Sequence, residues 1–569
     1  MSDGGRRFFN HPLSPFPVPP KHQSIEPTMN KHALPFSIQD LIRTLGAEQD
    51  LTPRRARDLL ERADIKEEDL MPWADFDHSP LNSYGRQLVY DGGFFEMMAM
   101  SWTPGDYSAI HDHGHTQWGA VQVFGPAEHS VFLEQDNEIK TLSRAPVKPG
   151  QVLAVGHQLV HQMGNPSQTN FLTFHLYGCY GRTHGITGDA RIFDLEENRI
   201  QRTDNGVFFA MAENQIKLRE PGPHPDYLTW LRNITELKNR IDRARKHETL
   251  SPELEQRDRE AVRKLCDPVN WTRLEQDLMQ HVDEKTGHMT DLGYWNLLRS
   301  ELIAAAKLQK LLLFPQDQGD PFFTYAELYD ELIGEPCLDE FIAGYLKFVI
   351  EKYRLEMKKT KLLSIGCGTG VIEEYLIREL GLPHDHLLGI DKSEAMVQVA
   401  SRRIAARAED VLSLSGQEWD LTYCGLNVFQ YLSPDQLDQA LAVTAQITRP
   451  GGYFFGDFIT PDHIRTYPHV IKSNTGNVLS LRHPVLIERE NYTFQQSEIL
   501  NVNRSNGKLL ITNEGKHLRF LPPLWRLRQM FEQAFKGKVD IYDAVTLDPI
   551  GPKADTCPST RYLLVAQKK

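Results

Sequence analysis

The stretch GDYSAIHDHGHTQWGAVQVFG, residues 105–125, decides the expected fold and chemistry of the first half of the chain. It is bounded by glycines and carries His111 and His113, separated by one residue. Because side chains alternate along a strand, both histidines point to the same face. His161, further along the chain, could add a third nitrogen ligand from a neighbouring strand. An isolated pair of this kind is commonly a surface or core feature. Together with the third histidine, however, it indicates a metal site in which coordination positions of the metal stay open for substrate.

The residues around this stretch are typical of an antiparallel β domain. Short segments rich in apolar and aromatic residues are separated by turn signals such as Pro104-Gly105 and Gly125-Pro126. Many short strands at intervals of about ten residues predict a sandwich or a barrel. A helical spacing of apolar residues from Ser37 to Ala63 predicts a small helical preface. The expected strands are residues 94–102, 119–124, 129–133, 152–155 and 171–177.

The chain has 569 residues, which is too long for one hydrophobic core and suggests three or four domains. A helical, highly charged region follows the β domain, and its charges are most simply the solvated faces of helices. From Tyr325 onward strands and helices alternate, which is typical of a doubly wound α/β sheet. The expected fold class is multidomain: an all-β barrel, a helical connector and a C-terminal α/β Rossmann-like domain. The expected boundaries are 1–35 for a disordered tail, 36–205 for the β domain with its preface, 206–320 for the connector and 321–569 for the α/β domain.

Composition and charge favour a cytoplasmic protein with small-molecule partners. Apolar residues make up 40% of the chain and charged residues 24%, and no run of about 18 apolar residues is present that could span a bilayer. Residues 1–29 are polar and rich in proline, without the apolar core of a secretory signal. The net charge of −13 argues against nucleic acid or a membrane as partner. The six cysteines form no Cys-x-x-Cys pair, so reduced thiols are expected, and the oligomeric state stays open.

The spacing of glycines and histidines in two segments resembles the two consensus motifs of the cupin superfamily, whose fold is a small β-barrel with inward-facing metal ligands. The acidic ligand usual four or five positions after the second histidine is absent, and Gln117 and Trp118 stand there instead. Three histidines without a carboxylate leave the full charge of a divalent metal, which attracts an anionic ligand such as a thiolate. Over residues 80–195 this combination resembles the thiol dioxygenases, cysteine dioxygenase in particular, and implies Fe(2+) held by the three histidines. The motif residues are Gly105, His111, His113 and Gly125 in the first segment and Gly150, His161 and Asn165 in the second.

The same resemblance implies roles for residues beyond the metal ligands. The hexapeptide YGRQLV is similar to the segment where the family places an arginine for the substrate carboxylate, and its Arg86 can hold a carboxylate bidentately. The pentapeptide TFHLY is similar to the segment that supplies a serine–histidine–tyrosine relay, with Thr173, His175 and Tyr177 in those places. The implied reaction adds both atoms of O2 to a small carboxylated thiol, such as cysteine or an analogue, and gives a sulfinate. An ordinary surface ion pair is the alternative role for Arg86.

Two positions depart from the animal members of that family. In those proteins a cysteine near the second ligand is covalently joined to the tyrosine. Here that position falls on Trp118 or Gly119, so the crosslink cannot form. The loop after the second ligand also carries an extra histidine, His115, which is more simply a loop residue than a fourth ligand. Both departures leave the identity of the thiol open.

A second chemical centre is the stretch LLSIGCGTG, residues 362–370. It predicts a buried strand, a glycine-rich turn and a helix whose N-terminus faces a cofactor. Gly366, Gly368 and Gly370 alone would also fit an NAD enzyme. Asp391, however, ends the next expected strand, where a carboxylate can bind both ribose hydroxyls.

With an Arg-Pro-Gly-Gly motif before a later strand, these features resemble a class I S-adenosylmethionine-dependent methyltransferase over residues 320–569. The resemblance implies S-adenosylmethionine at the three glycines and the aspartate, with Asp410 near the adenine and residues 420–431 on the methyl-transfer side. NAD binding and a degenerate, inactive domain are the alternatives. Residues 458–520 interrupt the α/β pattern as an expected insertion over the active face. Aromatic residues that could shape an acceptor pocket, or equally belong to the core, are Tyr492, Phe494, Phe520 and Trp525.

The sequence thus predicts a bifunctional enzyme, an iron thiol dioxygenase of the cysteine dioxygenase type joined to a methyltransferase. Because the two domains share one chain, we expect the methyltransferase to act on the sulfinate product or a related small molecule. Two other interpretations are open. The cupin could be a metal-dependent sensor or binding module that regulates the methyltransferase, or the methyltransferase could act on a protein acceptor.

Overall fold

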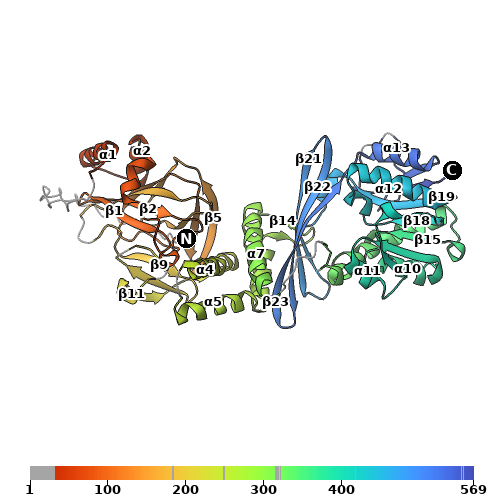
Figure 1. The fold of residues 1–569 in the computed structure, drawn as a ribbon, viewed down its shortest axis with the longest axis horizontal. Helices are drawn as coiled ribbons and strands as arrows, with labels where there is room; N and C mark the ends of the chain where they lie inside the picture. The colour runs from red at the N-terminus through yellow and green to blue at the C-terminus, as the bar shows by residue number, and fades with distance from the viewer. Residues whose placement is uncertain are drawn as a thin grey trace, which may run out of the picture. The chain divides into compact units, whose positions relative to one another are not determined.

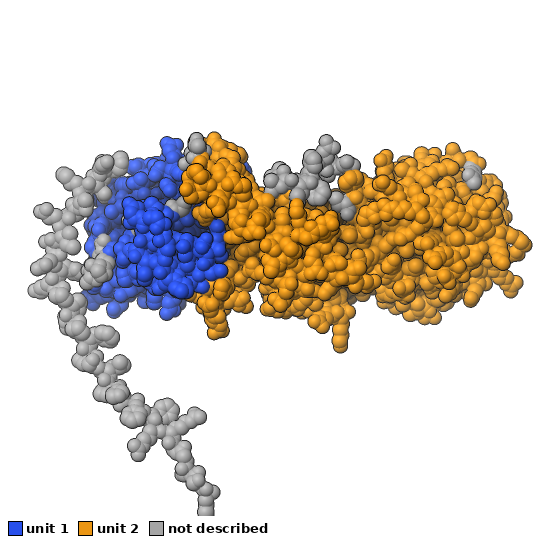
Figure 2. Space-filling view, turned by 90° about the horizontal axis from the view of Figure 1, so that it is seen from below, with its two compact units in different colours: residues 1–132, 145–222 blue, residues 133–144, 223–569 orange. Residues whose placement is uncertain are grey.

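The computed structural model describes residues 33–569 except 182–184, 205, 210, 248–249, 314–319, 321, 324, 417, 553 and 555. The predicted disordered tail therefore lies outside the described residues, apart from its last three. The chain divides into two compact units, shown in different colours in Figure 2. Unit 1 comprises Met1–Phe132 and Ala145–Gly222, and unit 2 comprises Leu133–Arg144 and Pro223–Lys569.

Unit 1 is built around a five-stranded antiparallel sheet with a helical preface (Figure 1). The preface consists of α1 (Phe36–Ala47), α2 (Pro53–Arg62) and α3 (Glu67–Leu70). Ile38 and Leu59 of the preface pack in one cluster with Phe95 and Trp118 of the sheet. The strands, in spatial order, are β1 (Gly85–Asp91), β2 (Phe95–Trp102), β8 (Phe171–Gly178), β3 (Trp118–Val123) and β6 (Val152–Val155).

Strand alternation separates the two faces of this sheet. On β2, Met97 belongs to the cluster under the helices, whereas Met98 belongs to a second cluster that also contains Met163. Met163 lies on β7 (Val160–Gly164), which pairs with β4 (Ala127–Gln135). The sheet is therefore covered on both faces, by helices on one and by further strands on the other, which is the predicted β-barrel architecture.

The smaller elements of the first half continue this β structure. Strands β9 (Ala190–Asp194), β10 (Arg199–Thr203) and β11 (Ile216–Pro221) form an antiparallel sheet of their own. Residues 216–221 pair with β10 in this sheet, so the helices begin later than residue 206, at Tyr227. In unit 2, β12 (His224–Pro225) pairs with β5 (Glu138–Val147), and its two residues lie opposite Glu138 and Ile139.

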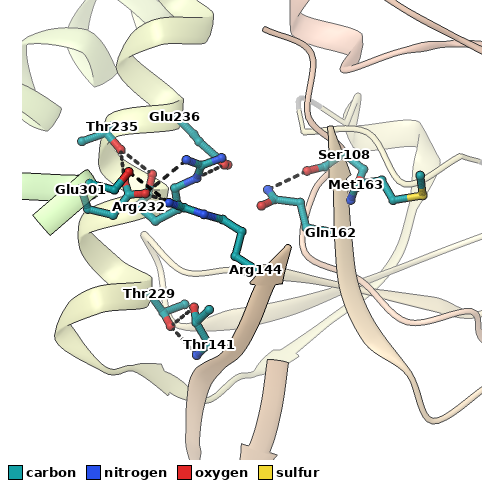
Figure 3. A network of polar contacts seen from close by, with 11 residues as sticks. Ser108, Thr141, Arg144, Gln162, Met163, Thr229, Arg232, Thr235, Glu236 and Glu301 are labelled. Carbon is teal, nitrogen blue, oxygen red and sulfur yellow. Dashed lines mark hydrogen bonds and ion pairs between the residues drawn. The ribbon is translucent and has the colours of Figure 1, made fainter. Parts of the chain in front are cut away.

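The helical part of unit 2 is fixed by a buried polar network (Figure 3). Its helices are α4 (Tyr227–His247), α5 (Pro252–Leu265), α6 (Asn270–Met279) and α7 (Leu292–Leu313). The carboxylate of Glu301 on α7 accepts hydrogen bonds from Arg232 and Thr235 on α4, both at 3.2 Å, and pairs with Arg144 of β5. Burial alone would raise the pKa of Glu301, but the two guanidiniums lower it. The pairing therefore ties two helices to a strand.

The α/β region has a seven-stranded sheet in the order β17-β16-β15-β18-β19-β25-β24. All neighbours are parallel except β25, which is antiparallel to β19 and to β24. The order reverses between β15 and β18, and ligands of such sheets bind beyond the carboxyl ends of the strands at this point. The strands are β15 (Leu362–Ile365), β16 (Leu387–Asp391), β17 (Ala406–Ala408), β18 (Trp419–Cys424), β19 (Thr448–Ile459), β24 (Val539–Asp543) and β25 (Arg561–Gln567).

Helices cover both faces of this sheet, as expected for a doubly wound fold (Figure 1). Leu363 and its neighbours pack against α12 (Pro434–Ile447) and α13 (Leu524–Phe535). Leu362, on the opposite face, packs against α9 (Ala343–Lys352) and α10 (Val371–Arg378). Between α10 and α12 the chain also forms α11 (Glu394–Ala400).

The expected insertion is a separate four-stranded antiparallel sheet in the order β20-β21-β22-β23. Its strands are β20 (Val470–Lys472), β21 (Val478–Arg489), β22 (Tyr492–Ser505) and β23 (Lys508–Phe520). In the described part of the chain, no helix combines the length and the apolar character needed to cross a membrane.

Candidate metal centre and cofactor cavity

The three predicted metal ligands lie together in the interior of unit 1. His111 and His161 form an isolated β-bridge, because the backbone N–H of each donates to the backbone carbonyl of the other, at 3.0 and 2.9 Å. Nε2 of His113 lies 3.1 Å from Nε2 of His161. Ligand nitrogens of all three histidines fall within 4.8 Å of one another, and the three side chains are buried.

The donor set fits a divalent metal. Burial lowers the pKa of His111 to about 4 and lowers those of His113 and His161 well below the usual range, so all three imidazoles are neutral and keep a lone pair. The Nδ1–H of His111 donates to the carbonyl of Ala109 at 2.8 Å, which leaves its Nε2 for a metal. Asp112 is not a ligand in this arrangement, because its carboxylate accepts a 2.6 Å bond from Arg191.

A fourth histidine, which the sequence did not single out, supports this centre. Nε2 of His129 on β4 lies 2.8 Å from Nδ1 of His161. With Nε2 of His161 directed to a metal, its Nδ1–H donates to His129. Such a partner fixes the ring orientation and tautomer of a ligand. His129 stands two residues from Val131, the partner of His161 in the β4–β7 register, so only the strand pairing reveals it.

The positions just after the second ligand have structural roles. His115 is exposed and lies outside the three-histidine group. Gln117 is exposed as well, and Trp118 is buried beside Phe94 and Tyr180. The residue that faces Tyr177 is Gly119, where an added Cβ would lie 2.7 Å from Cδ1 of the ring. Of the two positions considered for the crosslink, Gly119 is therefore the one opposite the tyrosine.

Arg86 lines the same cavity as the three histidines. The cavity has a volume of about 40 Å³, and Tyr84, His175 and Tyr177 also line it. Nη2 of Arg86 lies 3.5 Å from Oγ1 of Thr187, and Arg86 makes no ion pair with any described residue. Its guanidinium is thus available to a carboxylate inside the cavity.

The predicted relay residues share the inner face of β8, since they are two and four residues apart. Oγ1 of Thr173 lies 2.7 Å from Nε2 of His175, and Nδ1 of His175 lies 2.8 Å from the hydroxyl of Tyr177. Nε1–H of Trp102, which can only donate, bonds to Oγ1 of Thr173 at 2.9 Å. Burial lowers the pKa of His175 to about 3, so the ring is neutral.

These contacts order the protons of the relay. Thr173 accepts from Trp102 and donates its own hydrogen to Nε2 of His175. The single N–H of His175 is then on Nδ1 and donates to the oxygen of Tyr177. The hydroxyl hydrogen of Tyr177 is left for the cavity. Burial raises the pKa of Tyr177, so the hydroxyl keeps this hydrogen at neutral pH.

The glycine-rich turn of unit 2 lines a second, much larger cavity of about 1260 Å³. Gly366 and Gly368 line it and have φ of 71° and 54°, a conformation that favours glycine. A Cβ on Gly368 would meet nothing closer than 3.9 Å, so the bare backbone there leaves room for a ligand. Gly370 is not among the lining residues and serves as the N-cap of α10.

The two acidic residues expected at this cavity also line it. The carboxylate of Asp391 accepts the N–H of Gly368 and of Ser393, each at 2.9 Å, and burial raises the pKa of Asp391. Each of its oxygens keeps a lone pair for a ribose hydroxyl. Asp410 pairs with Lys392 at 3.2 Å and caps the turn that follows β17. These residues fit an adenosyl cofactor, and Cys367, buried beneath the turn, is a packing residue.

The aromatic residues suggested for the acceptor pocket are not among those that line the cavity. Phe494 and Phe520 belong to the core, Tyr492 packs against it, and Trp525 is 48% exposed. The insertion instead turns other side chains to the cavity, which are Tyr467, Arg482, His517 and Arg519. Strand alternation explains the difference, because neighbouring residues of β23 point to opposite faces.

Comparison with known proteins separates the two halves of the chain. Residues 30–180 match the family profile "Cysteine dioxygenase type I", and residues 362–452 match the profile "Methyltransferase domain". "Cysteine dioxygenase type 1" of Danio rerio is 27% identical over 153 residues, which are 25% of this chain and 75% of that protein. "Ubiquinone biosynthesis O-methyltransferase" of Saccharophagus degradans is 29% identical over 112 residues, 18% of this chain and less than half (44%) of that protein.

Among solved structures, a S-adenosylmethionine-dependent methyltransferase from Clostridium acetobutylicum aligns with 15% identity and a TM-score of 0.35, covering 43% of this chain and 98% of that one. DesVI of Streptomyces venezuelae aligns with 18% identity and a TM-score of 0.32, covering 45% and 100%. The two profile matches coincide with the three-histidine cavity and the glycine-rich cavity. The chain therefore joins a domain of the cysteine dioxygenase type to a methyltransferase domain.

Proposed function

We propose that the protein is a bifunctional cytoplasmic enzyme that oxidises a small carboxylated thiol to a sulfinate and transfers a methyl group to that product or a related small molecule. The observation that carries the proposal is the small cavity of unit 1, where three neutral histidines, one arginine without an ion pair and one tyrosine hydroxyl converge. Cysteine, a small thiol with a carboxylate, fits these groups.

In the first reaction a thiolate and O2 combine to a sulfinate, so that sulfur loses four electrons and the two oxygen atoms gain them. His111, His113 and His161 would hold Fe(2+), which supplies the one-electron steps that O2 requires. Arg86 binds the carboxylate of the substrate and fixes where its sulfur lies. The cavity of about 40 Å³ has room for roughly three water molecules, which restricts the substrate to a small one.

The relay of β8 keeps a hydrogen-bond donor in place. Because Thr173 and His175 hold the oxygen of Tyr177 from one side, its O–H points to the reacting oxygen atoms and donates to the charge that develops on them. Nδ1 of His175 already carries the hydrogen of the ring and donates it to Tyr177, so it cannot accept the tyrosine proton, and Tyr177 acts as a fixed donor.

In the second reaction the methyl group leaves the sulfonium of S-adenosylmethionine and bonds to a nucleophile of the acceptor, which loses a proton. This displacement depends on orientation more than on acid–base groups. Gly366, Gly368 and Asp391 would place the cofactor at one end of the large cavity. The remainder of that cavity would hold the acceptor.

The first activity is tested with the purified full-length protein, ferrous iron, cysteine and O2, by following O2 uptake and sulfinate formation. His113→Ala is expected to abolish iron binding and O2 uptake. His115→Ala is the matched control, since His115 is exposed and outside the metal group, and it should change both by no more than about twofold. Equal O2 uptake by the two variants would contradict the metal site.

The order of the two activities is tested by release of S-adenosylhomocysteine. The wild-type protein supplied with cysteine should release it only after sulfinate forms. His113→Ala should fail with cysteine and recover when the sulfinate is added directly. If His113→Ala methylates equally well with no oxidised product present, the sequential function is wrong.

A further inference from the structure

Two arginines of the insertion point into the large cavity of unit 2. Arg482 lies on β21 and Arg519 on β23, the two strands that flank β22. Arg482 pairs with Ile499 of β22, and Arg519 pairs with Gln495. Positions 495 and 499 of one strand share a face, and partners across an antiparallel ladder share it too. Both guanidiniums therefore lie on the cavity side of the sheet, as the lining residues show.

Neither arginine has an anionic partner among the described residues. Arg482, which is 3% exposed, donates to the hydroxyls of Tyr325 at 3.0 Å and Ser480 at 3.3 Å. Arg519 donates to the hydroxyl of Tyr431 at 2.8 Å. Arg561, at the same cavity, contrasts with both because its guanidinium pairs with the carboxylate of Asp457.

Several buried nitrogens at this place lack a hydrogen-bond partner among the described residues. They are Nε and Nη1 of Arg519 and Nε2 of the buried His517. His517 pairs with Ser497 of β22 and so projects from the same face as the two arginines. Buried donors without acceptors are costly, and a buried cation without a counter-ion is costlier still. An anionic ligand would satisfy all of them together.

Aromatic rings offset only part of this cost. The guanidinium of Arg519 lies over the ring of Tyr431 at 5.0 Å, and that of Arg482 lies over the ring of Tyr467 at 5.5 Å. Such contacts attract a cation but leave its N–H donors without acceptors. Burial would raise the pKa of Tyr467, yet the two guanidiniums lower it to about 8. The site thus carries a strong positive potential.

The size of the cavity leaves room for a second ligand beside the cofactor. Its volume of about 1260 Å³ exceeds the roughly 300–1,000 Å³ of an ordinary small-molecule pocket. The glycine-rich turn and Asp391 line it, and so do the two arginines contributed by the insertion. The carboxylates at the cofactor turn, Asp391 and Asp410, are engaged there.

We propose that Arg482 and Arg519, with His517, form a site for an oxyanion of the methyl acceptor, so that the acceptor is a small molecule bearing a carboxylate, sulfinate or sulfonate. This rests on the proposed function of the domain as a methyltransferase for a small molecule. The two guanidiniums project from one sheet face and both lie over the ring of Tyr467, at 5.5 and 5.7 Å. Guanidiniums bind the planar or pyramidal oxygens of such a group in forked geometry. The product of the first domain, a sulfinate with a carboxylate, belongs to this class.

The site is tested by calorimetric titration of the full-length protein saturated with S-adenosylhomocysteine, in a buffer free of sulfate and phosphate. Four probes share an aminoethyl group: 3-aminopropanoate, 2-aminoethanesulfinate, 2-aminoethanesulfonate and, without an oxyanion, 2-aminoethanol. At least one oxyanion probe should bind and 2-aminoethanol should not. Arg482→Gln and Arg519→Gln should each weaken that binding roughly 10- to 100-fold. Arg489→Gln, at the exposed end of β21, is the matched control.

Affinity for S-adenosylhomocysteine, measured first, shows that each variant is folded. If a glutamine variant does not bind S-adenosylhomocysteine, the corresponding lysine variant is used in its place. Lysine keeps the charge but loses the forked geometry, so weaker oxyanion binding is again expected. Equal affinity for 2-aminoethanol, no binding of any oxyanion, or binding that is the same in the arginine variants and the control would each overturn the proposal. The probes are supplied directly, so this test does not depend on the first domain. If the oxyanion probes bind through the arginines but the protein makes no sulfinate, the sequential function is wrong and the oxyanion site is still supported.

Discussion

Nδ1 of His175 lies 2.8 Å from the hydroxyl oxygen of Tyr177, two residues along the same strand. The contact ends a chain of hydrogen bonds that begins at the indole N–H of Trp102 and passes through Thr173. Since an indole can only donate, the chain has one direction, and the hydrogen of Tyr177 faces the metal cavity. The three residues at alternate positions of β8 therefore fix the directions of these hydrogen bonds, while the strand also forms part of the barrel.

Removing the hydroxyl should therefore separate catalysis from metal binding. Tyr177→Phe is expected to lower the kcat of thiol oxidation roughly 100- to 10,000-fold, as loss of a positioned donor does. Its iron content should equal that of the wild type, because the ring is not a ligand. Thr173→Val, which breaks the chain upstream, should lower kcat less. O2 uptake and iron analysis on the same samples check this, and wild-type turnover by Tyr177→Phe would rule out the donor role.

Arg86 should govern the choice of thiol. Arg86→Gln removes the forked contact to a carboxylate and is expected to raise KM for cysteine roughly 10- to 100-fold. Cysteamine, which has no carboxylate, should show the same KM in the variant and the wild type. Initial rates of O2 uptake with both thiols give the comparison. A preference for cysteine that survives in the variant would contradict the proposed contact.

His129 should control how tightly the metal is held. His129→Ala removes the acceptor of the His161 Nδ1–H and is expected to lower iron affinity roughly 10- to 100-fold. His129→Gln, which restores an acceptor, should recover part of the loss. Competition with a ferrous chelator measures the affinity directly, and His115→Ala serves as the surface control. Unchanged affinity in His129→Ala would mean that the ring contributes packing alone.

Asp391 should decide cofactor affinity. Asp391→Ala removes both ribose contacts and the support of the Gly368 N–H, and a roughly 10- to 100-fold weaker affinity for S-adenosylhomocysteine follows. Asp385, exposed in the turn before the same strand, provides the control Asp385→Ala. Calorimetric titration measures both variants. Similar affinities in the two would mean that the cofactor lies elsewhere.

The network around Glu301 predicts a pH-dependent stability. Glu301→Gln removes the buried carboxylate that pairs with Arg144 and Arg232 and should destabilise the protein by about 3–5 kcal/mol at neutral pH. The folded-state pKa of Glu301 is below its ordinary value. The stabilisation is thus complete above that ordinary value and is lost as the pH falls through the folded-state pKa. Urea unfolding at several pH values should show the wild type and variant converging only in acid.

The sequence predicted the chemical residues of each centre more completely than their surroundings. Spacing of two along an extended segment placed His111 with His113, although the structure has only an isolated bridge at His111 and begins β3 later, at Trp118. Thr173, His175 and Tyr177 were predicted from the resemblance to the family, and they share one face of β8. His129 was missed because its contact depends on the register between β4 and β7, which the sequence does not specify. The three glycines also differ in their roles. Gly366 and Gly368 line the cavity, whereas Gly370 is the N-cap of α10.

The acceptor side of the second cavity shows another limit. Phe520 and Arg519 are neighbours on β23, so that Phe520 faces the core and Arg519 faces the cavity. The sequence left Phe520 as a residue of either the pocket or the core, and the structure places it in the core and its charged neighbour at the cavity. A buried cation is found at a cavity because of what it binds, and that information is absent from periodicity.

The contact between Gly119 and the ring of Tyr177 has a consequence for how the enzyme comes into being. With a glycine opposite the ring, no thioether can form between residue 119 and Tyr177 during the first turnovers. The intact mass of the protein should therefore not fall by the two hydrogens that such a bond would remove. Activity should therefore start without a lag once iron is bound, and preparations of different age should differ only in metal content.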